Sequence, residues 1–501
     1  MRHPLLFSLI TAVLILSSCG RDECESLVPS TPSQAPDYLC TWNLQGYLSD
    51  LGPSEEFRRM MNERSLFSDA PFEGWTSLYP SIRGDLFFVM DDSWDIPQDA
   101  NYRNGNPYFG TVQLDTTRFP SFRGSPVGRL RALSDSVRAL GWKGLGGWIC
   151  AQKGDNFAGV SDDEFWKERL EEAEAGGVRY WKLDWGRDAT KEGFREKITS
   201  LGRLYAPHLI IENAMGEGNI RFSDTYRTYD VENITAQTVT VDRVARLLHH
   251  VHDPGAMGII NCEDEAYVAA ALGCAIGIMR HPFAGNLPSG KSDYAFPAVG
   301  RNLKCRTDEI VRAVRWHRIA PPFGVDGNCQ VDTARVHDGW EYHENESWIG
   351  HEIGSIVRAQ APARVSRRMP LPEVGDSSPE RPIVLCSTYP GGDVAVATVG
   401  RSLGREFVLK EVPVKVNVSS RGAKVGIFGR YSSLTLVYAE PLGKVKVLSQ
   451  DLASDTPVDI TRRVKITGNE LTIPGEVIAQ VGLMAASEGD LSDPGMVLCL
   501  K

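Results

Sequence analysis

The chain has 501 residues, of which 42% are hydrophobic and 24% are charged, the balance of a soluble globular protein. This length exceeds what one hydrophobic core normally supports, so we expect two domains. The formal net charge of -10, without long basic runs, argues against nucleic acid as a partner and favours a neutral or polar small molecule.

The N-terminus predicts export. A basic start precedes an apolar run over residues 5–16 that is too short to span a bilayer as a mature helix. The run ends in Leu16-Ser17-Ser18-Cys19, which resembles the lipobox of bacterial lipoproteins. This resemblance implies a signal peptide over residues 1–18, a lipid on Cys19, and a tether over 19–36. The protein would then be anchored to a bacterial membrane, on the periplasmic or cell-surface face. A plain signal peptide is the alternative.

Ten cysteines are scattered through the chain, without a Cys-x-x-Cys motif or a Cys/His spacing typical of zinc. One or two disulfides and free buried thiols are both compatible with this pattern. We therefore expect no metal or other cofactor.

From residue 37 to residue 321, short strand-like runs alternate with amphipathic helical runs. Helix boundaries are marked by Pro126 in a first turn, by a Ser161/Glu164 capping box, and by glycine stops. We predict strands over residues 38–42, 85–90, 142–150, 178–184, 208–213, 226–231, 257–261 and 276–281, and helices over 54–64, 126–140, 161–176, 191–205, 241–250, 266–274 and 307–318.

Eight strands alternating with helices predict an α/β fold, a (β/α)8 TIM barrel over residues 37–321. The chain has no Gly-x-Gly-x-x-Gly after its first strand to favour a dinucleotide fold. Residues 322–378 are polar and contain several prolines, and we predict a linker or insertion there. Short Val/Leu-rich runs separated by turns over 379–501 predict a C-terminal antiparallel β-sandwich.

The stretch Val178–Gly186 carries a charged pair at a strand end. Lys182 and Asp184 are two residues apart, so both side chains leave one face of the strand. Such charges are costly in a buried sheet unless they meet a partner or a ligand. Taken alone, this pattern indicates a structural ion pair.

The other predicted strands change that interpretation, because functional residues of a (β/α)8 barrel lie at the carboxyl ends of its strands. Carboxylates, aromatic rings and amides gather at these ends, as sugar binding requires, and two carboxylates on different strands suit glycoside hydrolysis. The set comprises Trp42, Asn43, Asp91, Asp92, Trp148, Lys182, Asp184, Glu212, Asn213, Arg227, Asp230 and His281.

The order of several short motifs resembles the α-galactosidase clan of glycoside hydrolases, nearest to family 27 and more distantly to family 36. The matching stretches are Cys40-Thr41-Trp42-Asn43, Met90-Asp91-Asp92-Ser93-Trp94, Arg118-Phe119-Pro120, Trp181-Lys182-Leu183-Asp184, Arg227-Thr228-Tyr229-Asp230 and Arg280-His281-Pro282-Phe283. Their order along the barrel, rather than any single motif, carries the resemblance.

The resemblance implies a retaining exo-glycosidase that hydrolyses terminal α-galactosyl residues. Asp184 would be the nucleophile and Asp230 the acid/base, with the two carboxyls about 5–5.5 Å apart. Asp184 has to stay ionised, which Lys182 favours, and Asp230 has to hold a proton. The substrate-binding residues would be Trp42, Asp91, Asp92, Trp148, Lys182, Glu212 and Arg227, with Glu212 reading the C2 substituent.

Two departures from the family pattern keep alternatives open. Arg227 and Asp230 are three residues apart where the family has four, so Asp224 and Glu232 are rivals for the acid/base. The fifth strand lacks the family's Cys-Glu-Trp run, so α-N-acetylgalactosaminidase or β-L-arabinopyranosidase activity is an alternative. A glycan-binding surface lipoprotein without turnover is an alternative of another class. The acidic end of strand seven, residues 263–265, fits either a helix N-terminal charge or a ligand role.

Overall fold

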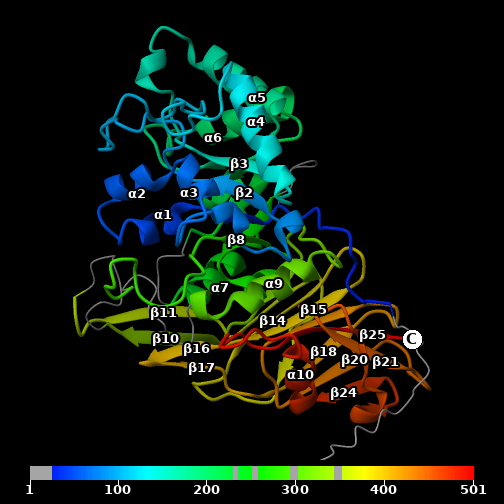
Figure 1. The fold of residues 1–501 in the computed structure, drawn as a ribbon. Coiled ribbons are helices and arrows are strands. Elements are labelled where there is room, and N and C mark those ends of the chain that lie inside the picture. Colours follow the sequence, from blue (N-terminus) through cyan, green and yellow to red (C-terminus); the bar gives the residue numbers. More distant parts are fainter. Residues whose placement is uncertain (1–24, 230–234, 251–257, 294–302, 343–351) are drawn as a thin grey trace, which may run out of the picture.

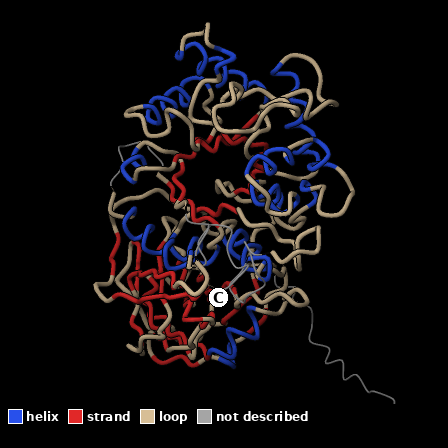
Figure 2. The backbone as a smooth tube through the Cα atoms, turned by 90° about the vertical axis from the view of Figure 1, so that its left-hand side faces the viewer, coloured by secondary structure: helices blue, strands red, loops and turns tan. Residues whose placement is uncertain are grey.

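The computed structural model describes residues 25–229, 235–250, 258–293, 303–342 and 352–501. A closed barrel of eight parallel strands lies above a β-rich C-terminal part (Figure 1), and its strands form a ring in Figure 2. The predicted TIM barrel is therefore confirmed. Its strands are β1 (Tyr38–Cys40), β2 (Phe87–Met90), β3 (Gly144–Ile149), β4 (Val178–Leu183), β5 (Ile210–Asn213), β6 (Thr225–Arg227), β7 (Ile259–Glu263) and β8 (Ala275–Ile278).

Helices follow the barrel strands, and several begin and end at the predicted signals. Ser125 caps the helix that starts at Pro126, and Ser161 accepts a hydrogen bond from the backbone N–H of Glu164. The barrel helices are α1 (Trp42–Leu48), α2 (Ser54–Met60), α3 (Glu63–Phe67), α4 (Pro126–Ala139), α5 (Asp162–Gly176), α6 (Phe194–Tyr205), α7 (Ala236–Leu247), α8 (Ala266–Leu272) and α9 (Thr307–Trp316).

The barrel interior is filled by aromatic rings that lie opposite glycines. Tyr38 and Tyr180 meet edge to face with ring centroids 5.1 Å apart. A Cβ on Gly146 would lie 2.9 Å from the Tyr180 side chain, and one on Gly277 would lie 2.8 Å from the Tyr38 ring. Large residues from β1 and β4 thus require small ones from β3 and β8, which leaves the core packed rather than hollow.

The C-terminal part contains three sheets, so the predicted sandwich is present, although some of its neighbouring strands are parallel. The elements are β9 (Cys329–Val331), β10 (Arg335–Glu341), β11 (Ile356–Pro362), β12 (Arg364–Arg367), β13 (Glu373–Val374), β14 (Ile383–Thr388), β15 (Val394–Val399), β16 (Arg401–Gly404), β17 (Glu406–Val408), β18 (Pro413–Val418), β19 (Val425–Phe428), β20 (Ser433–Tyr438), β21 (Val447–Asp451), β22 (Val458–Asp459), β23 (Lys465–Thr467), β24 (Glu470–Pro474), α10 (Gly475–Gly482) and β25 (Gly495–Leu500).

Residues 322–378 differ from the predicted linker or insertion. They contribute β9 and β12 to the eight-stranded sheet, β10 and β11 to the four-stranded sheet, and β13 to the five-stranded sheet. Strand β10 alternates buried and exposed positions, as a half-buried strand does, but its polar exposed face and the prolines nearby mask that signal in the sequence.

The described end of the predicted tether is packed rather than free. Leu27 and Val28 are buried, and the Leu27 N–H donates to Gln450 Oε1 at 2.7 Å. The Ser33 N–H donates to Asp85 Oδ1 at 2.7 Å, at the base of the barrel. Residues 25–36 therefore join the two parts of the molecule, because their apolar side chains find a core that the Ser/Pro-rich composition concealed.

The barrel packs on the eight-stranded sheet through α8 and α9. Trp316 of α9 and Phe428 of β19 belong to one continuous hydrophobic core, with ring centroids 6.2 Å apart. Arg312 of α9 makes a two-pronged ion pair with Asp451 of β21, with N–O distances of 3.0 and 3.2 Å, and both side chains are buried. The interface is thus built like a domain interior.

All eight cysteines in the described ranges are free thiols. Within those ranges, no helix combines the length and the apolar character needed to cross a membrane.

Candidate active site

Asp184 lies at the carboxyl end of β4, and three hydrogen bonds to two neighbouring residues fix the backbone there. Its N–H donates to Ile149 O at 3.0 Å, and Arg195 of α6 donates to the carbonyl oxygens of Leu183 and Asp184 at 2.9 and 2.8 Å. The chain then turns at Gly186, where φ is 154° and a Cβ would lie 2.6 Å from the Ala151 backbone. Glycine is required there, and the turn directs Asp184 towards the barrel mouth.

The Asp184 carboxylate has one partner on each oxygen. Arg227 Nη2 donates to Oδ1 at 2.5 Å, and Trp148 Nε1 donates to Oδ2 at 2.8 Å. Burial favours the neutral acid, but the charges of Arg227 and Lys182 and the Trp148 hydrogen bond outweigh it and lower the pKa of Asp184. The residue is 7% exposed, so an ionised, oriented carboxylate keeps a narrow opening to solvent.

Lys182 pairs with Asp91 rather than directly with Asp184. Its Nζ donates to Asp91 Oδ2 at 2.8 Å, and the Cys40 thiol donates to the same oxygen, also at 2.8 Å. Burial works against the charge on Lys182, but Asp91 outweighs it and raises the pKa of Lys182. Arg227 is therefore the cation in contact with Asp184, and Lys182 lowers the pKa of Asp184 from a longer distance.

Arg227 links three carboxylates beneath the mouth. Besides Asp184, its Nη1 lies 3.5 Å from Glu212 Oε1 and its Nε lies 3.9 Å from Glu263 Oε1. The guanidinium is fully buried, so its charge depends on these acids. An arginine anchored from below in this way is held rigidly against Asp184.

Glu212 lies deeper than predicted. It is 0% exposed, and Tyr180, Asn261 and Tyr38 donate to its carboxylate at 2.7, 2.6 and 3.3 Å. These donors, together with Arg227, occupy both oxygens. Glu212 thus lies in the barrel interior, where it holds Arg227. This position differs from the prediction that Glu212 reads the C2 substituent of the sugar.

Asp92 and the two tryptophans lie near the mouth in packed environments. Asp92 accepts from Arg58 Nε at 2.9 Å and from the Ser93 hydroxyl, and burial raises the pKa of Asp92 to about 6. Trp148 is buried, so its indole orients Asp184 and offers no open ring face to a sugar. Trp42 does not end a strand as predicted, because β1 ends at Cys40 and Trp42 opens α1.

The acid/base candidates fall in different places. Asp224 precedes β6 and accepts from the Ile211 N–H, at the start of β5, at 2.9 Å. It therefore lies at the amino end of the barrel strands, opposite the mouth. Asp230 and Glu232 lie outside the described residues, as does Cys19.

His281 lies near the mouth, after β8. Its Nε2 is 3.0 Å from Asp293 Oδ2, and Lys304 Nζ donates to the same oxygen at 2.8 Å. Its ring packs against Tyr47, with centroids 4.3 Å apart. These contacts hold the segment after β8.

Sequence reasoning missed several residues of this cluster. Asn261 is one of them: it lies two residues before Glu263 on β7, so the alternation that paired Lys182 with Asp184 also places it on the face of Glu263, which the sequence had marked only as part of the acidic end of strand seven. Cys40 could have been found in the same way on β1. Tyr229 carries no comparable signal, because its position depends on a turn that follows β6.

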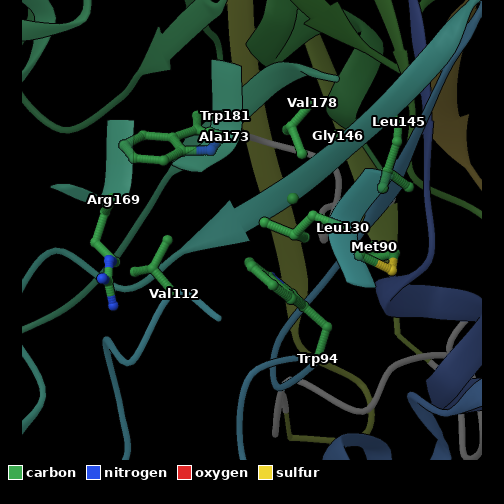
Figure 3. A pocket seen from close by; sticks show the side chains of 11 residues that line it. Met90, Trp94, Val112, Leu130, Leu145, Gly146, Arg169, Ala173, Val178 and Trp181 are labelled. Atoms are coloured by element: carbon green, nitrogen blue, oxygen red, sulfur yellow. The ribbon is translucent and has the colours of Figure 1, made fainter. Parts of the chain in front are cut away.

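A small cavity lies elsewhere, between β3 and the helices α4 and α5. Figure 3 shows Trp94, Leu130 and Trp181 around it. Its volume of ≈ 10 Å³ is at the lower limit for holding one water, so it is a packing gap. Within the described ranges, no group of three His, Cys, Asp or Glu side chains is arranged to hold a metal ion.

Comparison with known proteins gives similarity in structure only. No model of a protein family matches the chain, and no curated protein matches it. The α-galactosidase I of Mortierella vinacea is 10% identical over 94% of this chain and 98% of its own, with a TM-score of 0.39. The GH27 β-L-arabinopyranosidase of Geobacillus stearothermophilus is 11% identical over 93% and 96%, with a TM-score of 0.42. The α-galactosidase of Saccharomyces cerevisiae is 10% identical over 86% and 85%, with a TM-score of 0.38. Similarity at this level transfers no substrate and no residue role to this chain.

Proposed function

We propose that the protein is a retaining exo-glycosidase that removes terminal α-galactosyl residues from glycans, with Asp184 as its nucleophile. The supporting observation is the Asp184 carboxylate, which lies at the barrel mouth with one oxygen held by Arg227 and the other by Trp148. A nucleophilic carboxylate has to be ionised and fixed in orientation, and these two donors supply both conditions.

In the first step, an Asp184 oxygen forms a bond to the anomeric carbon, the bond to the leaving oxygen breaks, and an acid protonates that oxygen. In the second step, water gives a proton to the same residue, now a base, and its oxygen displaces Asp184 from the sugar. Asp230 is the proposed acid/base. Arg227 and Lys182 stay cationic beside the developing charges; Lys182 binds sugar hydroxyls, while the fully buried Arg227 acts through Asp184.

The proposal is tested by assaying purified protein against nitrophenyl α-galactoside, α-N-acetylgalactosaminide and β-L-arabinopyranoside. We expect turnover of the α-galactoside and a loss of at least about 10³-fold in Asp184→Asn, because a neutral amide cannot form the covalent intermediate. If the protein prefers one of the other two substrates, the proposed substrate changes and the proposed mechanism stands. No turnover of any of them, or unchanged rates in the variant, would refute the proposal.

The acid/base has its own test, with a matched control in the same segment. Asp230→Ala should lose activity on poor leaving groups and recover it with azide on activated substrates, because azide needs no base. Asp224→Ala should keep its activity, since Asp224 lies at the opposite end of β6. The reverse pattern would move the role to Asp224.

Export and lipid attachment at Cys19 rest on the sequence alone. Expression of the full chain in a bacterial host, followed by membrane fractionation, tests them. The wild-type protein should lie in the membrane fraction and take up labelled fatty acid from the medium, whereas Cys19→Ser should take up none; equal labelling of the two proteins would count against the lipid anchor.

A further inference from the structure

Tyr229 follows β6 in a conformation that L-residues rarely adopt. Its φ is 58°, in the left-handed region, which costs a tyrosine about 1 kcal/mol or more. Arg243 of α7 donates to the carbonyl oxygens of both Thr228 and Tyr229, and the Thr228 N–H donates to Asn261 O at 3.0 Å. Contacts from two neighbouring elements thus hold the strained turn in place.

The turn places the Tyr229 ring over the site. The Arg227 guanidinium carbon lies 4.9 Å from the ring centroid, a cation–π contact. Arg227 is fully buried, whereas Tyr229 is 48% exposed and is one of the large side chains that remain open to solvent. The ring therefore covers the cation that holds Asp184 and presents its other side outwards.

The phenol also lies within electrostatic reach of Asp184. The negative charge of Asp184 is the largest cause, and burial the second, of a rise in the pKa of Tyr229 to about 12. The hydroxyl is therefore neutral at every physiological pH. A neutral aromatic ring with a hydroxyl, beside a carboxylate and open to solvent, has the character of a sugar-binding platform.

We propose that Tyr229 is a substrate-contacting residue whose ring stacks on the sugar of the leaving group, outside the galactosyl position. This proposal rests on the proposed function. The galactosyl unit has to reach the 7% exposed Asp184, so it occupies the deeper position. The half-exposed ring lies further out, where the next sugar of the glycan would pass. Tyr229 would thus select for glycan substrates over galactosides with small leaving groups.

The test compares an α-galactosyl disaccharide with methyl α-galactoside in the full-length protein. Loss of one aromatic stacking contact corresponds to about tenfold in affinity. Tyr229→Ala should therefore raise KM for the disaccharide about tenfold and change that for the methyl galactoside less than about twofold. Tyr229→Phe, which keeps the ring, should remain close to wild type on both. Equal losses on both substrates, or no loss on either, would overturn the proposal.

Tyr205→Ala is the matched control. Tyr205 ends α6, away from the mouth, is partly exposed, and makes a similar cation–π contact with Lys167 at 5.3 Å. Tyr205→Ala should leave KM unchanged for both substrates.

Calorimetry in the Asp184→Asn background separates this inference from the proposed function. Disaccharide binding should weaken about tenfold on adding Tyr229→Ala, while binding of free galactose stays constant. Unchanged disaccharide binding overturns the role of Tyr229 alone. If neither galactose nor the disaccharide binds, the proposed substrate class is refuted, and the proposed stacking role of Tyr229 is refuted with it.

Discussion

Asp184 is controlled by two neighbours that act in the same direction. Arg227 supplies charge and Trp148 supplies a hydrogen bond, and together with Lys182 they overcome the burial that would protonate an isolated carboxyl group. Because the pKa of Asp184 lies below its ordinary value of 3.8, the carboxylate stays ionised throughout the neutral and mildly acidic range. A nucleophile prepared in this way needs no separate base to activate it.

Trp148→Phe tests this account through the pH profile. The acid limb of kcat/KM reports the free-enzyme pKa of Asp184, so in the wild type it should lie below the ordinary range of a carboxyl group. Removing the indole N–H removes a hydrogen bond to the charged form, which raises the pKa of Asp184 and moves the limb to higher pH.

Trp166→Phe is the control for that measurement. Trp166 packs against Trp181 with ring centroids 6.4 Å apart, on the helix-covered side of the barrel. It should leave the limb in place. A limb that is unmoved in Trp148→Phe would contradict the role given to Trp148.

At the scale of elements, the turn after β4 decides where Asp184 points. Gly186→Ala would force a methyl group onto the Ala151 backbone in a left-handed conformation. We expect it to lower the free energy of unfolding by about 2–4 kcal/mol and to reduce activity at temperatures where the fold persists.

Gly193→Ala separates backbone strain from steric clash in the same measurements. Gly193 also has a positive φ, 72°, but a Cβ there meets nothing within 4 Å. It should cost only about 1–2 kcal/mol and leave kcat unchanged. If Gly186→Ala and Gly193→Ala had equal effects on chemical denaturation and on activity, the close approach of residue 186 to the Ala151 backbone would be unimportant.

The order of the barrel elements could be predicted from the sequence because each strand and helix carries its own local period and stop signals. Positions that depend on neighbouring elements could not. Trp42 looked like a strand end because β1 is short and an aromatic residue continues its pattern, yet it opens α1. Residues 322–378 were missed because half-buried strands with one polar face resemble a linker.

The site was predicted in outline but not in depth. Spacing placed Lys182, Asp184 and Arg227 on strand ends, and the structure brings them together. It could not reveal that Glu212 is enclosed by tyrosines from other strands, since burial depends on barrel closure. Asp224 precedes the predicted strand over 226–231 just as it precedes β6, so its place at the amino end could be predicted; it was a rival for the acid/base only because it lies near Asp230 in the sequence.

At the scale of the whole molecule, the barrel and the eight-stranded sheet share one core, and Arg312 and Asp451 form a buried ion pair across it. Asp451→Ala would leave the buried guanidinium without its partner and should lower the free energy of unfolding by about 3–5 kcal/mol. Because the core is continuous, calorimetry should still show one cooperative transition.

Glu470→Ala is the matched control, since it removes the exposed pair with Lys415 inside the C-terminal part. The melting temperature of Glu470→Ala should be close to that of the wild type. Two separate transitions in either protein would show that the barrel and the sheets unfold independently.

The claim on which the rest depends is that Asp184 becomes covalently attached to the sugar. A 5-fluoro-α-galactosyl fluoride should trap that intermediate, and peptide mass spectrometry should find the added mass on the peptide containing Asp184, with no label in Asp184→Asn. The account predicts that label, together with release of the α-anomer first by NMR. A label on another carboxylate, or release of the inverted anomer, would contradict it.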